Sequence, residues 1–161
     1  MKRAVAVCGA VAMLMVAASA FAQGNFSGKW APDADKNPAP AAAGGGGGGR
    51  GGGGMAVPMT ITQTATELTI ERETPNGAMK TSYKLDGMEQ TVTMGQGEAK
   101  VTAKVAGSTI TISTTADRGN GPTTTTAVYS MEGANLVIAT TRPGRNGGEP
   151  TTNKVYYKKA M

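Results

Sequence analysis

The feature that most constrains this chain is a two-residue alternation that begins near residue 57 and continues almost to the C-terminus. Apolar residues recur at every second position and are separated by threonine, lysine or glutamate, as in a strand with one buried face. No window shows a helical stripe of apolar residues. The clearest alternating pairs are Leu68 and Ile70, Tyr83 and Leu85, Val92 and Met94, and Ile110 and Ile112.

Turn signals separate these alternating runs. Asn76-Gly77 and Asp86-Gly87 are pairs that favour tight hairpin turns, and further glycine-containing breaks follow at similar intervals. Their spacing is close to the roughly 8–12 residues expected of all-β folds, which gives about nine strands between residues 58 and 158.

A meander of this length must hide its apolar face. Closing into a barrel removes both sheet edges, so we predict an all-β fold: a single antiparallel up-and-down barrel of about 8–10 strands over residues 57–161. A two-sheet sandwich is the main alternative, but short connections between neighbouring strands favour the barrel. An outer-membrane barrel is a further alternative, which the charged outward positions and the lack of an aromatic girdle disfavour.

The N-terminus predicts export. Lys2 and Arg3 precede an apolar run, and Ala20-Phe21-Ala22 matches a signal-peptidase site, so residues 1–22 are interpreted as a signal peptide. The run is shorter than the roughly 20 residues of a membrane-spanning helix, so we expect no transmembrane anchor after cleavage. The mature protein is predicted to be periplasmic or extracellular.

Two segments precede the meander. Residues 23–31 are predicted to form a barrel plug or a short first strand. Residues 32–56, rich in proline, alanine and glycine, are predicted to be a flexible, disordered linker. Asp33 and Asp35 could be calcium ligands, but an Asp-x-Asp without further loop ligands is more typical of a solvated turn.

Phe26-Ser27-Gly28-Lys29-Trp30 resembles the Gly-x-Trp signature at the start of lipocalin and calycin-type barrels. The mature chain as a whole resembles exported bacterial lipocalin-like proteins. The resemblance implies that Trp30 closes one end of the barrel, which would leave any opening at the far end. The glycine-rich insert after Trp30 and the absence of a possible disulfide depart from the lipocalin pattern.

Composition excludes several kinds of chemistry. The chain has no histidine, and its one cysteine, Cys8, lies in the predicted signal peptide. Thiolate catalysis, imidazole general-base catalysis and nitrogen- or sulfur-ligated zinc sites are therefore excluded from the mature chain. We predict no catalytic residues, no metal site, no cofactor and no enzymatic activity. The formal net charge of +5 includes Lys2 and Arg3, and the basic residues are scattered, so no nucleic-acid partner is expected.

Two functions stay open. The first is a non-enzymatic binding protein that holds a small apolar or amphipathic ligand inside the barrel. The second is an envelope or surface interaction module whose barrel is filled and binds no small molecule. We expect a monomer in either case. The predicted ligand-binding residues, all assigned to the barrel interior, are Trp30, Leu68, Ile70, Tyr83, Leu85, Met94, Ile110, Ile112 and Tyr129.

Overall fold

The computed structural model describes residues 24–37, 56–74, 77–94, 97–117, 119, 121–144 and 147–160. The predicted signal peptide and the glycine-rich tract lie outside these residues. The described chain forms ten strands: β1 (Gly28–Pro32), β2 (Met59–Gln63), β3 (Glu67–Thr74), β4 (Gly77–Lys84), β5 (Asp86–Met94), β6 (Gly97–Ala106), β7 (Thr109–Asp117), β8 (Pro122–Glu132), β9 (Asn135–Arg142) and β10 (Thr151–Lys159).

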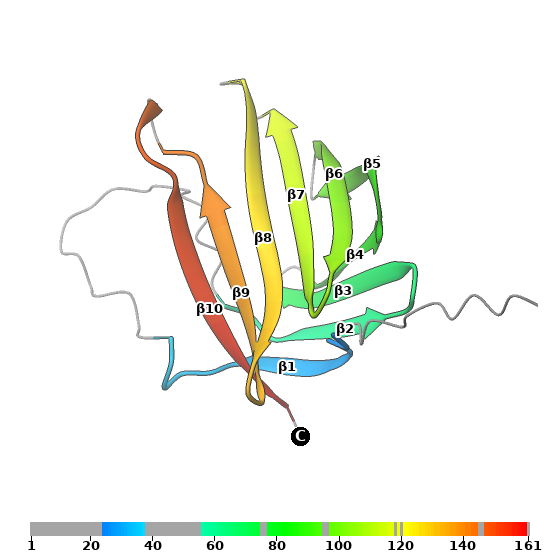
Figure 1. The fold of residues 1–161 in the computed structure, drawn as a ribbon, viewed down its shortest axis with the longest axis vertical. Helices are drawn as coiled ribbons and strands as arrows, with labels where there is room; N and C mark the ends of the chain where they lie inside the picture. The colour runs from blue at the N-terminus through cyan, green and yellow to red at the C-terminus, as the bar shows by residue number, and fades with distance from the viewer. Residues whose placement is uncertain are drawn as a thin grey trace, which may run out of the picture.

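All ten strands belong to one antiparallel sheet, in the order β4-β3-β2-β1-β10-β9-β8-β7-β6-β5. Figure 1 shows the sheet curling so that β1, β2 and β3 run across the lower ends of β7 to β10. The result is one nearly closed barrel, which confirms the predicted fold class and excludes the sandwich. The two end strands, β4 and β5, are joined through the single residue Leu85.

Next to Leu85, the side chain of Gln90 on β5 bonds to the last residue of β4. The Gln90 carboxamide accepts a hydrogen bond from the Lys84 backbone nitrogen and donates one to the Lys84 carbonyl oxygen, each at 3.1 Å. Gln90 thus satisfies two backbone groups that a neighbouring strand would otherwise satisfy.

The alternation places one side of every strand inside. On β7 to β9 the inward residues form successive rungs, because Ile110 lies opposite Tyr129, which lies opposite Ile138. The next rung contains Ile112 and Ala127, followed by Thr114 with Thr125. The interior therefore changes from apolar and buried at one end of the barrel to partly polar at the other.

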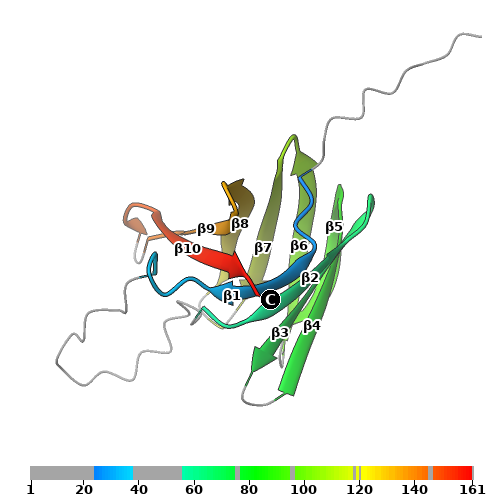
Figure 2. The same ribbon diagram turned by 90° about the horizontal axis from the view of Figure 1, so that it is seen from below.

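Residues before β1 close the lower end of the barrel. Figure 2 shows this segment crossing that end toward the β6–β7 turn. Phe26 is completely buried there, and Trp30 is 2% exposed. The Trp30 indole nitrogen donates a hydrogen bond of 2.9 Å to the Phe26 carbonyl oxygen. A Cβ on Gly24 would lie 2.6 Å from the Ser108 carbonyl oxygen, so this close crossing requires glycine.

Gln63 fixes this closing segment to β2. Its carboxamide accepts a hydrogen bond from the Phe26 nitrogen at 2.8 Å and donates one to the Gly24 carbonyl oxygen at 2.9 Å. Gln63→Ala is therefore expected to lower the free energy of unfolding by about 1–2 kcal/mol in urea titrations. Thr62→Ala, an exposed neighbour on β2, serves as the control and should change it by less than about 0.5 kcal/mol. Equal losses for both variants would contradict this role of Gln63.

The residues after β1 form a turn that continues the pairing with β10. The Asp33 nitrogen donates to the Tyr156 carbonyl oxygen, and the Asn37 side chain bonds both the nitrogen and the carbonyl oxygen of Tyr156. Asp33 is only 7% exposed, and its carboxylate accepts a hydrogen bond of 2.8 Å from Asn135. The turn expected at Asp33 and Asp35 is present, but the expectation that it is solvated is wrong for Asp33. These residues belong to the range predicted as linker.

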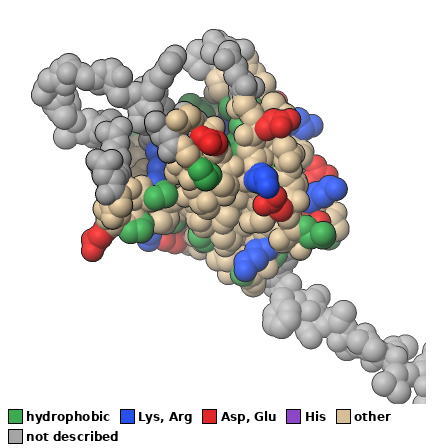
Figure 3. All heavy atoms as spheres, turned by 90° about the horizontal axis from the view of Figure 1, so that it is seen from above, with side chains coloured by type: hydrophobic (Ala, Val, Ile, Leu, Met, Phe, Trp, Pro, Cys, Tyr) green, Lys and Arg blue, Asp and Glu red, His purple; other side chains and the backbone are tan. Residues whose placement is uncertain are grey.

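The outer surface is polar and mixed in charge. On the face in Figure 3, acidic and basic side chains are interspersed, and neither sign dominates a region. Threonine hydroxyls pair across neighbouring strands on the outside, as in Thr115 with Thr124 at 2.7 Å and Thr141 with Thr152 at 2.7 Å.

Among the described residues, no helix has the length and apolar character needed to cross a membrane.

Candidate ligand-binding cavity

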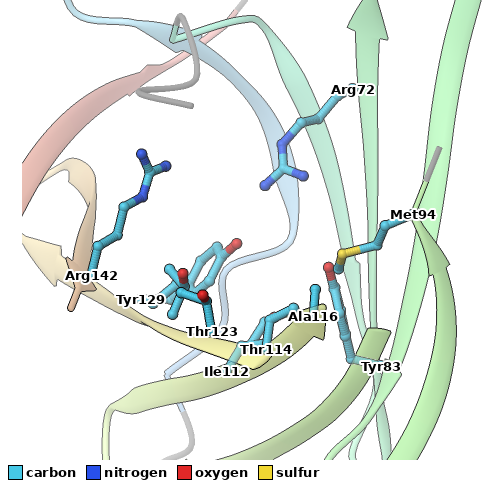
Figure 4. Close-up of a pocket in the computed structure, with 11 residues that line it drawn as sticks. Arg72, Tyr83, Met94, Ile112, Thr114, Ala116, Thr123, Tyr129 and Arg142 are labelled. Atoms are coloured by element: carbon cyan, nitrogen blue, oxygen red, sulfur yellow. The ribbon is translucent and has the colours of Figure 1, made fainter. Parts of the chain in front are cut away.

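The barrel contains a cavity of about 440 Å³. Its wall comes from six strands, β3, β4, β5, β7, β8 and β9, and Figure 4 shows side chains from both sides of the barrel directed into it. The lining residues are Arg72, Tyr83, Met94, Ile112, Thr114, Ala116, Thr123, Thr125, Ala127, Tyr129 and Arg142.

The cavity lies at the end of the barrel remote from Trp30. Tyr157 of β10 pairs with both Pro32 of β1 and Leu136 of β9, so the Leu136 end of β9 is the closed end. At about 3.3 Å per residue, Arg142 lies roughly 20 Å further along β9. The closed half of the interior is filled by the packed core, and the hollow half begins at Ile112 and Ala127.

Arg72 lies at the centre of the polar groups in this cavity. It continues the inward face of β3 after Leu68 and Ile70, and it is half-buried. Its guanidinium lies near the phenols of Tyr83 and Tyr129, and its positive charge opposes the rise in the pKa of both. The long arginine side chain thus extends from β3 toward Tyr83 of β4 and Tyr129 of β8.

Burial dominates the protonation of the tyrosines near Arg72. Removal from water raises the pKa of Tyr83 to about 12, and the neighbouring Tyr129 adds to the rise while Arg72 opposes it. Burial likewise raises the pKa of Tyr129 and of Tyr157, in both cases against the opposing effect of Arg72. These phenols are therefore neutral hydrogen-bonding groups at physiological pH, and they leave the charge of Arg72 unneutralised.

The wall formed by β7 and β8 supplies hydroxyl groups toward the rim. Thr114 and Thr125 lie opposite each other in register, and Ala116 lies opposite Thr123 one rung further out. Arg142, the last residue of β9, is exposed at the rim. The cavity thus combines an apolar inner surface with hydroxyls and two guanidinium groups, which suits a molecule with one apolar and one polar part.

Four of the nine residues predicted to bind a ligand line this cavity: Tyr83, Met94, Ile112 and Tyr129. The other five lie in the packed core, and none of them is among the lining residues. These are Trp30, Leu68, Ile70, Leu85 and Ile110.

Arg72 and Arg142 were not among the predicted ligand-binding residues, although the sequence contains a signal for both. Extending the alternation of Leu68 and Ile70 by one step reaches Arg72, and extending Leu136 and Ile138 reaches Arg142. Both arginines were left out because only apolar residues were assigned to the inward side of each strand. Thr114, Thr123 and Thr125 were missed for the same reason.

Within the described part of the chain, no group of three or more histidine, cysteine, aspartate or glutamate side chains is arranged to hold a metal ion. Glu71 and Glu73 flank Arg72 in sequence but are exposed, as the alternation of β3 requires.

Solved structures provide the comparison with known proteins. A zebrafish ileal bile acid-binding protein in complex with cholic acid aligns with a TM-score of 0.57 at 18% identity, over 84% of this chain and 98% of that one. The REP1-NXSQ fatty acid transporter aligns with a TM-score of 0.58 at 16% identity, over 84% and 96%. Secretory abundant heat soluble protein 4 from Ramazzottius varieornatus gives 0.54 at 21% identity, over 84% and 94%.

No model of a protein family matches the chain, and a search of curated proteins returns no match. At these identities the structural likeness concerns the fold. The chain therefore has a lipocalin-like β-barrel fold, shared with this bile acid-binding protein and this fatty acid transporter.

Proposed function

We propose that this protein is a non-enzymatic binding protein that holds one small amphipathic molecule in the open end of its barrel. The observation that carries the proposal is the cavity of about 440 Å³ opposite the Trp30 end. Ligand pockets in proteins typically measure about 300–1,000 Å³, so this cavity is large enough for one small molecule.

The composition of the wall supports an amphipathic ligand over a purely apolar one. Met94, Ile112, Ala116 and Ala127 offer apolar contacts, and Met94 is adaptable in shape. The hydroxyls and guanidiniums offer hydrogen bonds to a polar group. The structural neighbours named above include proteins described as binding cholic acid and transporting fatty acid, which is consistent with a ligand of this kind.

The proposal keeps two predictions made from the sequence, export and a monomeric state. Native mass spectrometry of protein purified from its own envelope bears on both, because the mass identifies the mature N-terminus at Gln23 and the number of chains. The same spectrum reports any bound small molecule, which can be extracted and identified.

Filling the cavity should block binding. Ala127→Phe places a ring in the hollow half of the barrel and is expected to weaken ligand binding by about tenfold or more. Ala139→Phe makes the same change on the outer side of β9 and should leave ligand occupancy unchanged. Occupancy by native mass spectrometry and thermal shift with added amphipathic molecules measure the effect.

A protein that binds no small molecule would give a different result in the same two measurements. A mass of the bare chain, together with no thermal shift across a panel of lipids and metabolites, would contradict the binding function. The envelope or surface interaction module, which binds no small molecule, would then be the better account.

A further inference from the structure

Two positive charges enter the cavity, and no negative charge lines it. Arg72 comes from β3 and Arg142 from β9, and Figure 4 shows them on opposite sides of the cavity with Tyr129 between them. No aspartate or glutamate is among the lining residues. The site therefore has an excess of positive charge in a partly desolvated space, where electrostatic interactions are stronger than in bulk water.

Neither arginine is neutralised from elsewhere in the described part of the chain. The ion pairs found there join Lys100 to Glu89 at 3.0 Å and Lys154 to Glu132 at 3.8 Å, both on the surface. The carboxylates nearest to Arg72 in sequence, Glu71 and Glu73, are exposed. A half-buried guanidinium without a carboxylate partner is costly to maintain, and a bound anion would offset that cost.

The groups around Arg72 are suited to an anion as well. The Tyr83 and Tyr129 phenols are neutral and can donate hydrogen bonds, and the hydroxyls of Thr114 and Thr125 lie on the facing wall. Guanidinium and hydroxyl donors together are the groups that proteins use to bind carboxylate and phosphate oxygens.

We propose that the ligand is an amphipathic anion whose acidic group binds between Arg72 and Arg142 while its apolar part contacts Ile112 and Ala127. This inference rests on the function proposed above and specifies the chemical class of the ligand. The acidic group is a carboxylate or a phosphate ester, two chemistries that the same donors accept and that titration separates.

The test compares four probes that each contain ten carbon atoms in one straight chain and differ in the head group: decanol, decanoate, decyl phosphate and decylammonium. Calorimetric titration should show decanoate or decyl phosphate binding about 10–100-fold more tightly than decanol, the effect of one charge-assisted interaction. Decylammonium should bind more weakly than decanol. If decanoate binds more tightly than decyl phosphate, the acidic group of the ligand is a carboxylate. If decyl phosphate binds more tightly, the acidic group is a phosphate ester.

Arg72→Gln removes the charge but keeps hydrogen-bond donors, and it should reduce the preference for the anions over decanol at least about tenfold. Lys104→Gln makes the same change of charge on the exposed face of β6 and should leave the preference intact. A urea titration of each variant verifies folding, and Arg72→Lys, which retains the charge, should keep most of the preference if Arg72→Gln is unstable.

The outcomes separate this inference from the proposed function. If no probe binds, the proposed function itself is contradicted. If decanol or decylammonium binds as tightly as the anions, the cavity binds ligands but the anionic class is wrong. If the anions are preferred and Arg72→Gln retains that preference, the assignment of Arg72 is overturned.

Discussion

Replacing Trp30 with alanine should lower the free energy of unfolding by about 3–5 kcal/mol, as for a large aromatic side chain removed from a packed interior. Trp30 is almost completely buried, and its indole nitrogen donates to the Phe26 carbonyl oxygen at 2.9 Å. The ammonium of Lys159 lies 6.0 Å from the ring centre. Removing the indole leaves a void and an unpaired carbonyl at the closed end. Urea unfolding monitored by circular dichroism measures the loss.

Two further variants are compared with Trp30→Ala to show what causes that loss of stability. Trp30→Phe keeps most of the ring volume and loses the hydrogen bond, so it should cost about 1–3 kcal/mol, less than the alanine variant. Met88→Ala, at an exposed position on β5, should change the free energy by less than about 0.5 kcal/mol. A comparably small effect of Trp30→Ala would show that the indole does not close the barrel.

The second large effect is a loss of stability at alkaline pH. The pKa of Tyr83 is about 12 in the folded protein, against an ordinary value of 10. The folded state favours the neutral phenol over the ionised one. The contribution of Tyr83 to the free energy of unfolding is therefore fully present below about pH 10 and is lost as the pH rises to about 12. A shift of this size corresponds to roughly 3 kcal/mol for Tyr83. The raised pKa values of Tyr129 and Tyr157 act in the same direction.

Urea titrations between pH 9 and about pH 12, with tyrosinate absorbance recorded in parallel, would measure this dependence. Tyr83→Phe cannot ionise at this position, so its stability should fall less steeply over the same interval. A wild-type free energy of unfolding that stays constant up to about pH 12 would contradict the burial of these phenols.

The sequence predicted the strands because alternation and turn signals are local properties. Leu68 and Ile70 face inward as expected, and the chain forms the predicted up-and-down barrel. Alternation also placed Arg72 on the same face, so the interior location of this charge was available from the sequence. What alternation identifies is the inward side of each strand.

Alternation does not show which part of the interior is filled. Ile110 and Ile112 are neighbours on one face of β7 and both belong to the buried core, yet only Ile112 also lines the cavity. The difference depends on where Phe26 and Trp30 close the barrel, and that depends on contacts between distant segments. The burial of Asp33 has the same origin, since its partner Asn135 lies 102 positions away in the chain.

The most direct test of the cavity is a nitrogen-15 NMR titration of the mature protein with decanoate. We predict that amide shifts concentrate at Arg72, Tyr83, Ile112 and Tyr129. The amide shifts of the closed end, at Phe26, Trp30 and Leu136, should stay unchanged. Shifts centred on the closed end, or shifts confined to the outer surface, would contradict a binding site in the open half of the barrel.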